Sequence, residues 1–144
     1  MRFKPGLFVS LIGVAMIFLT SSASPISAHH VPPAGTFNDT FSDVQGVVKE
    51  ARFRPPHVWI ILEVKAADGE LQVWPLEAAS PAVLQGIGVT PDYLKVGDTV
   101  KARCRRLSVV PKGHDSDCIL GFLKARDGAV KDWSGNNLPA PTDF

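Results

Sequence analysis

A central β-hairpin is predicted by the stretch Pro55-Pro56-His57-Val58-Trp59-Ile60-Ile61-Leu62-Glu63-Val64 and by the stretch Leu71-Gln72-Val73-Trp74-Pro75-Leu76-Glu77 that follows it. Both are rich in β-branched and aromatic residues, which favour strands. Asp68-Gly69 between them is typical of a two-residue turn with positive φ angles. That turn would pair Val64 with Val73, Glu63 with Trp74 and Ile61 with Leu76. We expect both faces to be covered, because apolar residues would line each of them: Trp59, Ile61, Trp74 and Leu76 on one, and Val58, Ile60, Leu62 and Val64 on the other.

The first 28 residues have the layout of a secretory signal peptide. Arg2 and Lys4 precede an uncharged run over residues 7–19, and a stretch rich in Ser, Ala and Pro ends at Ala28. The apolar run is shorter than the roughly 20 residues that a membrane-spanning helix needs. We therefore expect cleavage after Ala28, with Ala23 as the second candidate, and a periplasmic or secreted mature chain without stable membrane insertion.

The mature chain would be close to electrical neutrality. The full sequence has 15 Lys and Arg against 14 Asp and Glu, and cleavage removes Arg2 and Lys4, which leaves a net charge of −1. Proteins that bind nucleic acids or anionic membranes depend on surplus positive charge, so we expect no nucleic acid among the partners. The residues after the signal peptide are enough for one domain with a modest core.

Histidines at the predicted N-terminus indicate a metal site. Cleavage after Ala28 would make His29 the first residue, and its amine and imidazole would chelate one metal ion. A second imidazole, from His30, His57 or His114, would complete a three-nitrogen site suited to copper. Cleavage after Ser27 would instead give Ala28-His29-His30, whose amine, backbone nitrogens and third-position imidazole also suit Cu(II). The alternative is an extended Pro-rich arm, residues 29–41, whose histidines meet no metal.

The remaining sequence predicts further strands and a short helical insert in a domain over residues 42–133. The first strand runs from about Asp43 to Phe53, and Gly46 within it indicates a bulge or a sharp bend. Ser80-Pro81 begins a helix that Gly86 ends. A long alternating strand covers 99–110, its partner about 117–125, and a last strand 130–133. Residues 134–144 are expected to be disordered.

Two cysteines in an exported chain are usually joined. If Cys104 and Cys118 pair directly across a hairpin, Ala102 lies opposite Leu120 and Val100 opposite Phe122. This register gathers apolar residues on the cysteine side, so we expect a disulfide that contributes about 3 kcal/mol in the chain-entropy model. A redox or metal-binding thiol pair would have the closer C-x-x-C spacing.

Several side chains are candidates for an interaction surface. Lys101, Arg103 and Arg105 alternate along one side of the long strand as a basic stripe, which is either a solvated face or an anion-binding surface. His57 falls on the face of Trp59. Pro75 cannot donate to a ladder, and a bulge there would move Glu77 to the other face. The candidate surface consists of Trp59, Trp74, Glu77, Lys101, Arg103 and Arg105.

The order and spacing of several short motifs resemble a known family. These motifs are Ala28-His29-His30, Pro56-His57-x-Trp59-Ile60, Asp68-Gly69, Trp74-x-Leu76-Glu77, Ser80-Pro81-x-x-Leu84, Gly88-x-Thr90-x-x-x-Leu94 and Lys95-x-Gly97-Asp98-x-Val100. Over residues 29–133 the chain resembles the small secreted bacterial proteins of domain-of-unknown-function family 6152. The resemblance implies a small OB-like β-barrel with no assigned activity. The chain departs from the family pattern at Pro55, which replaces Asn, and at Val89, which replaces Trp.

We therefore expect a mostly β protein, a small OB-like β-barrel of five or six strands with a short helical insert. The sequence shows no Ser-His-Asp, Cys-His, paired-carboxylate or phosphate-loop arrangement, which favours a protein that is not an enzyme. The leading hypothesis is a binding protein for copper or another small ligand, using His29 with His30 or His57. The alternative is a protein-interaction or envelope-structural module whose partner is an envelope protein.

Overall fold

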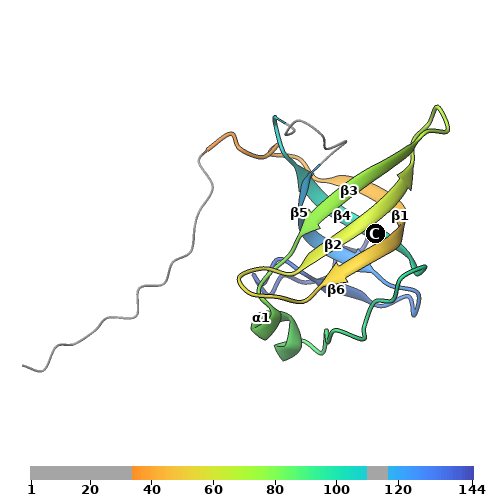
Figure 1. The fold of residues 1–144 in the computed structure, drawn as a ribbon. Coiled ribbons are helices and arrows are strands. Elements are labelled where there is room, and N and C mark those ends of the chain that lie inside the picture. The colour runs from red at the N-terminus through yellow and green to blue at the C-terminus, as the bar shows by residue number, and fades with distance from the viewer. Residues whose placement is uncertain (1–33, 110–116) are drawn as a thin grey trace, which may run out of the picture. The chain divides into compact units, whose positions relative to one another are not determined.

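The chain folds as a mostly β structure with very little helix (Figure 1). The computed structural model describes residues 34–109 and 117–144. The elements within these ranges are β1 (Ser42–Arg52), β2 (Trp59–Lys65), β3 (Leu71–Glu77), α1 (Pro81–Gly86), β4 (Thr99–Arg106), β5 (Cys118–Lys124) and β6 (Val130–Asp132). None of the helical residues in this part of the chain forms a segment long and apolar enough to cross a membrane.

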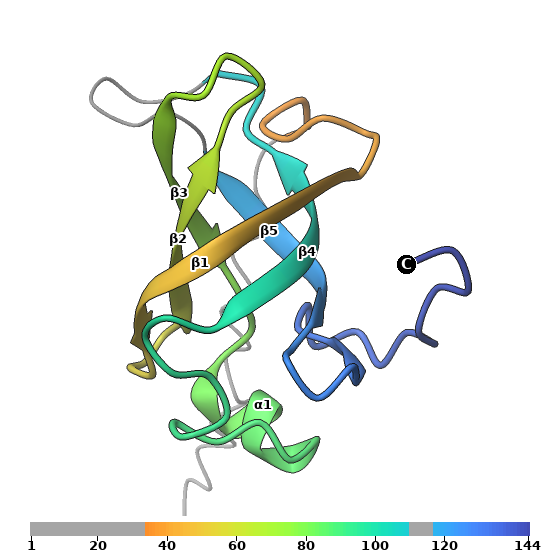
Figure 2. The same ribbon diagram turned by 90° about the vertical axis from the view of Figure 1, so that its right-hand side faces the viewer.

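Five of the strands close into a barrel (Figures 1 and 2). Their order is β3-β2-β1-β4-β5, neighbours in this order are antiparallel, and β6 adds an extra strand next to β5. The barrel closes where β3 pairs with β5 in parallel, at Leu76 with Cys118 and at Glu77 with Ile119. A closed, mixed five-stranded barrel with a helix between β3 and β4 confirms the predicted OB-like fold.

β1 is the strand that turns the corner of the barrel. Residues 42–47 pair with β4 and residues 47–52 pair with β2. The irregularity in the β1–β2 ladder lies between Val48 and Glu50, and not at Gly46. Gly46 is needed for a different reason, because a Cβ there would lie 2.7 Å from the carbonyl oxygen of Glu63. The glycine therefore allows the backbones of β1 and β2 to approach closely.

The β2–β3 hairpin forms, but its predicted register is wrong by one residue. The Ala66 N–H donates to Glu70, and Ala66 O accepts from the Gly69 N–H, so the loop has three residues, 67–69, with a positive φ of 93° at Gly69. A three-residue loop of this kind shifts the returning strand by one position. The observed pairs include Ile60 with Leu76 and Leu62 with Trp74.

The new register moves the predicted faces of β3. Trp74 and Leu76 lie on the same buried face as Ile60 and Leu62, and the expectation of apolar cover on both sides is wrong. A one-residue slip moves every side chain to the opposite face of a strand. The outer face of β3 consequently exposes Val73.

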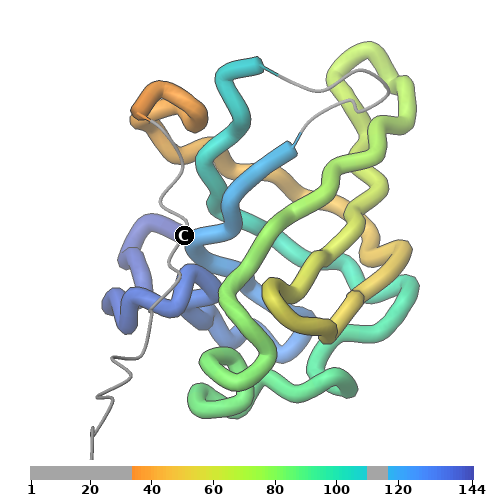
Figure 3. Tube along the Cα trace, turned by 60° about the vertical axis from the view of Figure 1, so that its left-hand side comes forward, coloured from red at the N-terminus to blue at the C-terminus, as the bar shows by residue number. Residues whose placement is uncertain are grey.

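The core fills the interior of the barrel and is closed at one end by α1 and the segment after it. Ser80 begins the helix as predicted, since its Oγ accepts a hydrogen bond from the Val83 N–H. Leu84, Val89 and Leu94 are buried in this end, which lies opposite the 66–70 turn of the hairpin (Figure 3). The strands supply most of the core: Val44, Val48, Ile60, Leu62, Leu76, Val100, Ala102, Leu120 and Leu123.

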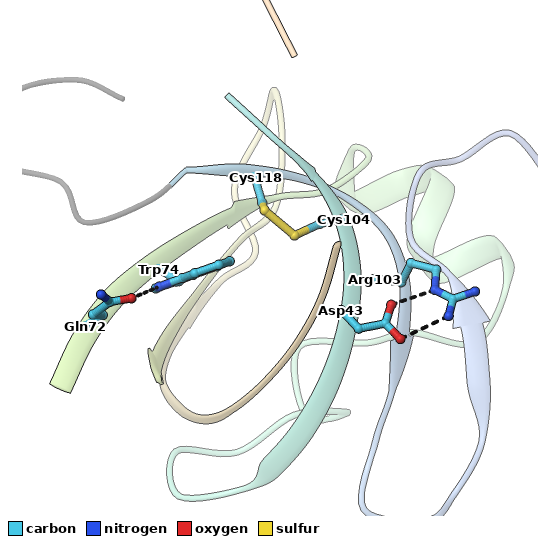
Figure 4. The surroundings of a disulfide bond; sticks show 6 residues. All are labelled: Asp43, Gln72, Trp74, Arg103, Cys104 and Cys118. Atoms are coloured by element: carbon cyan, nitrogen blue, oxygen red, sulfur yellow. Dashed lines mark hydrogen bonds and ion pairs between the residues drawn. A yellow bond between two sulfur atoms is a disulfide. The ribbon is translucent and has the colours of Figure 1, made fainter. Parts of the chain in front are cut away.

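The disulfide between Cys104 and Cys118 is confirmed (Figure 4), with the two Cα atoms 5.6 Å apart. The predicted register around it is wrong, because Cys104 pairs with Leu120 and Ala102 with Leu123. A bulge in the β4–β5 ladder between Arg103 and Cys104 leaves Gly121 without a pairing partner on β4. A Cβ at Gly121 would lie 2.8 Å from the exposed Phe41 ring and 3.2 Å from the carbonyl oxygen of Arg103, so a larger residue here would displace the ring.

Both flanking segments make contacts with the barrel. In the described part of the predicted N-terminal arm, Phe37 pairs with Leu107, and the Asn38 N–H donates to Arg106 O at 2.9 Å. Residues 134–144 contain no helix or strand, yet the Leu138 N–H donates to Asp132 Oδ2 and Arg103 donates to the Asp143 carboxylate. The C-terminal segment thus differs from the predicted disorder at these contacts.

Candidate functional site

His57 and Glu77 form a pair at the edge of the hairpin. His57 lies just before β2 and Glu77 ends β3, directly opposite Trp59. His57 Nδ1 contacts Glu77 Oε1, and the side chains are 44% and 28% exposed. The β2–β3 ladder runs without a bulge through Pro75, which pairs with Ile61. Pro75 therefore introduces no bulge that moves Glu77, and Glu77 shares the outer face with Trp59 because of the one-residue change in register.

This pair has the chemistry of an oriented histidine. A carboxylate on one ring nitrogen holds the ring in place and fixes its tautomer, which directs Nε2 toward any other ligand. His29 and His30, the other predicted metal ligands, lie outside the described residues. Among residues 34–109 and 117–144, no group of three or more His, Cys, Asp or Glu side chains is placed to hold a metal ion. His57 is therefore the one predicted metal ligand whose surroundings the structure describes.

The two tryptophans of the predicted surface lie on opposite sides of the sheet. Trp59 is half-buried on the outer face, whereas Trp74 is inside the barrel with 8% of its surface exposed. The Trp74 indole N–H donates to Gln72 Oε1 at 2.9 Å (Figure 4). The Arg106 guanidinium carbon lies 4.7 Å from the centre of the Trp74 ring. Trp74 is thus wrong as a surface residue, and the cause is the one-residue error in the hairpin register.

Lys101, Arg103 and Arg105 do share the outer face of β4, as the alternation predicts; this face is called the β4 basic face below. Asp43 on the neighbouring β1 accepts from Arg103 Nε at 2.6 Å (Figure 4). It also accepts from Lys101 Nζ at 3.0 Å. These contacts, first of all the hydrogen bond from Arg103, lower the pKa of Asp43 to about 2. The Asp43 carboxylate in turn raises the pKa of Arg103.

The C-terminal residues cover part of the β4 basic face, and sequence reasoning missed them. Arg103 Nη1 donates to Asp143 Oδ1 at 2.7 Å, which lowers the pKa of Asp143. The Phe144 ring centre lies 4.7 Å from Lys101 Nζ and 5.0 Å from Arg103 Cζ. The sequence feature that could have indicated this contact is the acidic and aromatic pair Asp143-Phe144, which follows the basic strand in the chain. Because about 40 residues separate them from Arg103, no local pattern links the two.

A polar pocket of about 350 Å³ lies at the end of the barrel that α1 closes, and the sequence did not indicate it. Tyr93 and Asp127 are among its lining residues. Burial, followed by the nearby Asp127 carboxylate, raises the pKa of the Tyr93 phenol. Lys131 Nζ lies 5.4 Å from the centre of the Tyr93 ring.

Comparison with known proteins gives a family but no activity. The model of a family of unknown function, DUF6152, matches residues 16–109, more than half of the chain. The chain therefore belongs to this family, which confirms the resemblance noted in its motifs. No curated protein matches the sequence.

Proposed function

We propose that this member of the family is an exported, non-enzymatic binding protein that holds a metal ion, with copper as the metal that its nitrogen donors suit. The observation that carries the proposal is the contact between His57 Nδ1 and Glu77 Oε1. Metal-ligating histidines commonly donate their other ring nitrogen to a carboxylate, which orients the ring and raises its basicity. Glu77 is held on β3 by pairing with Trp59 on β2 and with Ile119 on β5, so His57 would be a preorganised ligand.

The other donors would come from the predicted mature N-terminus. Cleavage after Ala28 gives His29 a free amine beside its imidazole, and His30 follows it. Together with His57 these groups offer the nitrogen ligands that Cu(II) binds well. A site assembled from one fixed histidine and one terminal segment would close when the metal arrives.

Export is supported by the signal-peptide layout and by the disulfide. Disulfides persist in oxidising compartments such as the periplasm and are rare in the cytosol, and Cys104 and Cys118 are joined in the structure. Both observations agree with a periplasmic or secreted protein.

A binding role is proposed in preference to catalysis because of where the shifted pKa values arise. Strongly shifted pKa values mark functional sites, but ion pairs shift them too. The shifts at Asp43, Arg103 and Asp143, like those at Glu50 and Arg52, come mainly from ion-paired hydrogen bonds on the outer surface. Tyr93 is the exception, because its pKa is raised mainly by burial beside the polar pocket.

The test is native mass spectrometry of the protein exported by a bacterial host, purified without chelator and given substoichiometric Cu(II). We expect a mass that begins at His29, lacks two hydrogens because of the disulfide, and carries one copper ion. Replacing His29 and His30 by alanine should abolish copper retention. Glu77→Ala should weaken it about 10- to 100-fold, the range for loss of a carboxylate behind a ligating histidine.

Glu63→Ala is the matched control, because Glu63 lies on the same outer face and pairs with Lys49. It should leave copper affinity unchanged. Protein that remains entirely metal-free after addition of substoichiometric Cu(II) would refute the metal proposal. Equal affinities of the Glu77→Ala and Glu63→Ala variants would remove the role of the His57–Glu77 pair.

The second candidate is a protein-interaction or envelope-structural module. It is favoured by the β4 basic face, where the guanidinium carbon of Arg105 lies 6.0 Å from the centre of the exposed Phe41 ring. Replacement of His29 and His30 by alanine distinguishes the two candidates, because it should leave the recovery of a protein partner unchanged.

A further inference from the structure

We propose that the β4 basic face binds an extended protein segment in which an acidic residue precedes an aromatic residue, and that Asp143 and Phe144 occupy this site within the same chain. The partner would be a protein that carries such a segment. This partner class belongs to the interaction module, the second candidate above, and the proposal rests on it. His57 and the metal are not involved.

Arg103 provides the acidic subsite. Its guanidinium group is shared by two carboxylates, with Nε and Nη2 on Asp43 at 2.6 and 3.0 Å and Nη1 on Asp143 at 2.7 Å. The side chain is 16% exposed with Asp143 and Phe144 in place, and the bidentate contact to Asp43 orients the guanidinium independently of these two residues. The bidentate contact to Asp43 leaves one edge of the guanidinium to receive a second carboxylate, and arginine is well suited to such planar recognition.

Lys101 and Arg103 together provide the aromatic subsite. Their charged groups lie 4.7 Å and 5.0 Å from the centre of the Phe144 ring. A cation within about 6 Å of an aromatic ring is attracted by the negative face of the ring. Lys101 and Arg103 lie two positions apart on β4, and Arg103 contacts both Asp143 and Phe144. The aromatic subsite is therefore directly beside the acidic subsite.

The charge on this face favours an acidic ligand. Three cationic side chains face outward from β4, and Asp43 is the carboxylate that the barrel itself places against Lys101 and Arg103. Positive charge therefore remains locally on a protein that is close to neutral overall. Local fields of this kind attract ligands of opposite charge and increase their rate of association.

The occupying segment is held weakly compared with the site. The Asp143 side chain is 74% exposed, and ion pairs in contact with water contribute little stability. The segment after β6 contains no helix or strand. A site on a rigid strand, covered by an irregular segment, allows exchange with a partner. The attached segment still competes, at an effective concentration of about 1 mM.

The experiment uses the full chain and a fluorescent peptide with the sequence of residues 139–144, Pro-Ala-Pro-Thr-Asp-Phe. Binding is measured by anisotropy at low ionic strength to wild type and to the Asp143→Ala/Phe144→Ala double variant. We expect the double variant to bind the peptide at least about 10-fold more tightly than wild type, because the competing segment is removed. Peptides with Asp replaced by Asn, or Phe by Ala, should lose this binding.

Variants of the face itself complete the test. In the double-variant background, Lys101→Gln and Arg103→Gln should each weaken binding, and circular dichroism confirms that both still fold. Arg54→Gln is the matched control, because Arg54 is an exposed arginine outside β4. It should leave binding unchanged.

Four outcomes would overturn the proposal. They are no saturable binding to the double variant, equal binding to wild type and double variant, equal binding of the Phe-to-Ala peptide, and a wild-type dimer that the double variant loses. Cross-linking in the host tests the second candidate separately. If a partner cross-links whether or not Lys101 is replaced, and the peptide does not bind, only this partner class is overturned. If no partner cross-links and the peptide does not bind, the interaction module is overturned as well.

Discussion

Removing the disulfide should destabilise the barrel substantially. The change is Cys104→Ala with Cys118→Ala, two residues separated by 14 positions. For a closed loop of about 15 residues, the chain-entropy model gives a loss of about 3 kcal/mol in the free energy of unfolding. Both side chains are buried, so the lost packing of the sulfur atoms adds to this value. With an unfolding entropy of about 2 cal/mol/K per residue, a domain of roughly 110 residues should melt about 13 °C lower.

The assay is urea denaturation of the oxidised wild type and the double alanine variant. The slope m should be larger for the variant, because its unfolded chain exposes more surface without the cross-link. Wild type unfolded and refolded with reductant is the control, since it loses the cross-link but keeps both sulfur atoms. Its stability should fall most of the way to that of the variant. A difference below about 1 kcal/mol between oxidised and reduced wild type would refute the loop-entropy reasoning.

Two further substitutions test the close approach of β1 to β2 and the ion pairs of Asp43 with the β4 basic face. Gly46→Ala should lower the free energy of unfolding by about 1–3 kcal/mol, because the new Cβ would lie 2.7 Å from the carbonyl oxygen of Glu63. Gly86→Ala is the control and should cost far less, because nothing lies within 4 Å of a Cβ at that position. Equal losses of stability in the two variants would contradict the argument. Asp43, with a folded pKa of about 2 against a usual 3.8, contributes stability that is present above about pH 4 and is lost as the pH falls through 2. Asp43→Asn should therefore cost about 1 kcal/mol at neutral pH, after allowance for solvent screening, and the difference from wild type in urea midpoint should shrink steadily as the pH falls from 4 to 2. A difference that is constant from pH 6 to pH 2 would show that the charge is not the cause.

The strands and the helix were predictable because they depend on local patterns. The Ser80-Pro81 start of α1 and the alternation of Val100, Ala102 and Cys104 need only neighbouring residues to be recognised. The register of the β2–β3 hairpin was not predictable from the turn alone, because Asp68-Gly69 is compatible with loops of two or three residues. The burial of apolar side chains on one face would have distinguished the two loop lengths. Only the three-residue loop gathers Trp74 and Leu76 on the face of Ile60 and Leu62.

Gathering apolar residues on one face is not a sufficient criterion for register, as β4 and β5 show. The predicted β4–β5 register also gathered apolar residues around Cys104 and Cys118, yet that register was wrong although the disulfide was correct. The bulge at Gly121 changes the alignment partway along the ladder. The Phe41 ring packs against Gly121, where it would lie 2.8 Å from a Cβ. No pattern within β5 reveals a contact with a residue about 80 positions away.

The two proposed sites depend on the sequence in different ways. The His57–Glu77 contact requires the observed register, because the two-residue turn would have placed Glu77 opposite Ile60, on the inner face. The β4 basic face requires only alternation within one strand, so Lys101, Arg103 and Arg105 were recognisable at once. What completes that face, Asp43 and the Asp143–Phe144 pair, comes from distant segments. A strand pattern therefore reveals the cationic side of such a site, and only the tertiary structure reveals what binds to it.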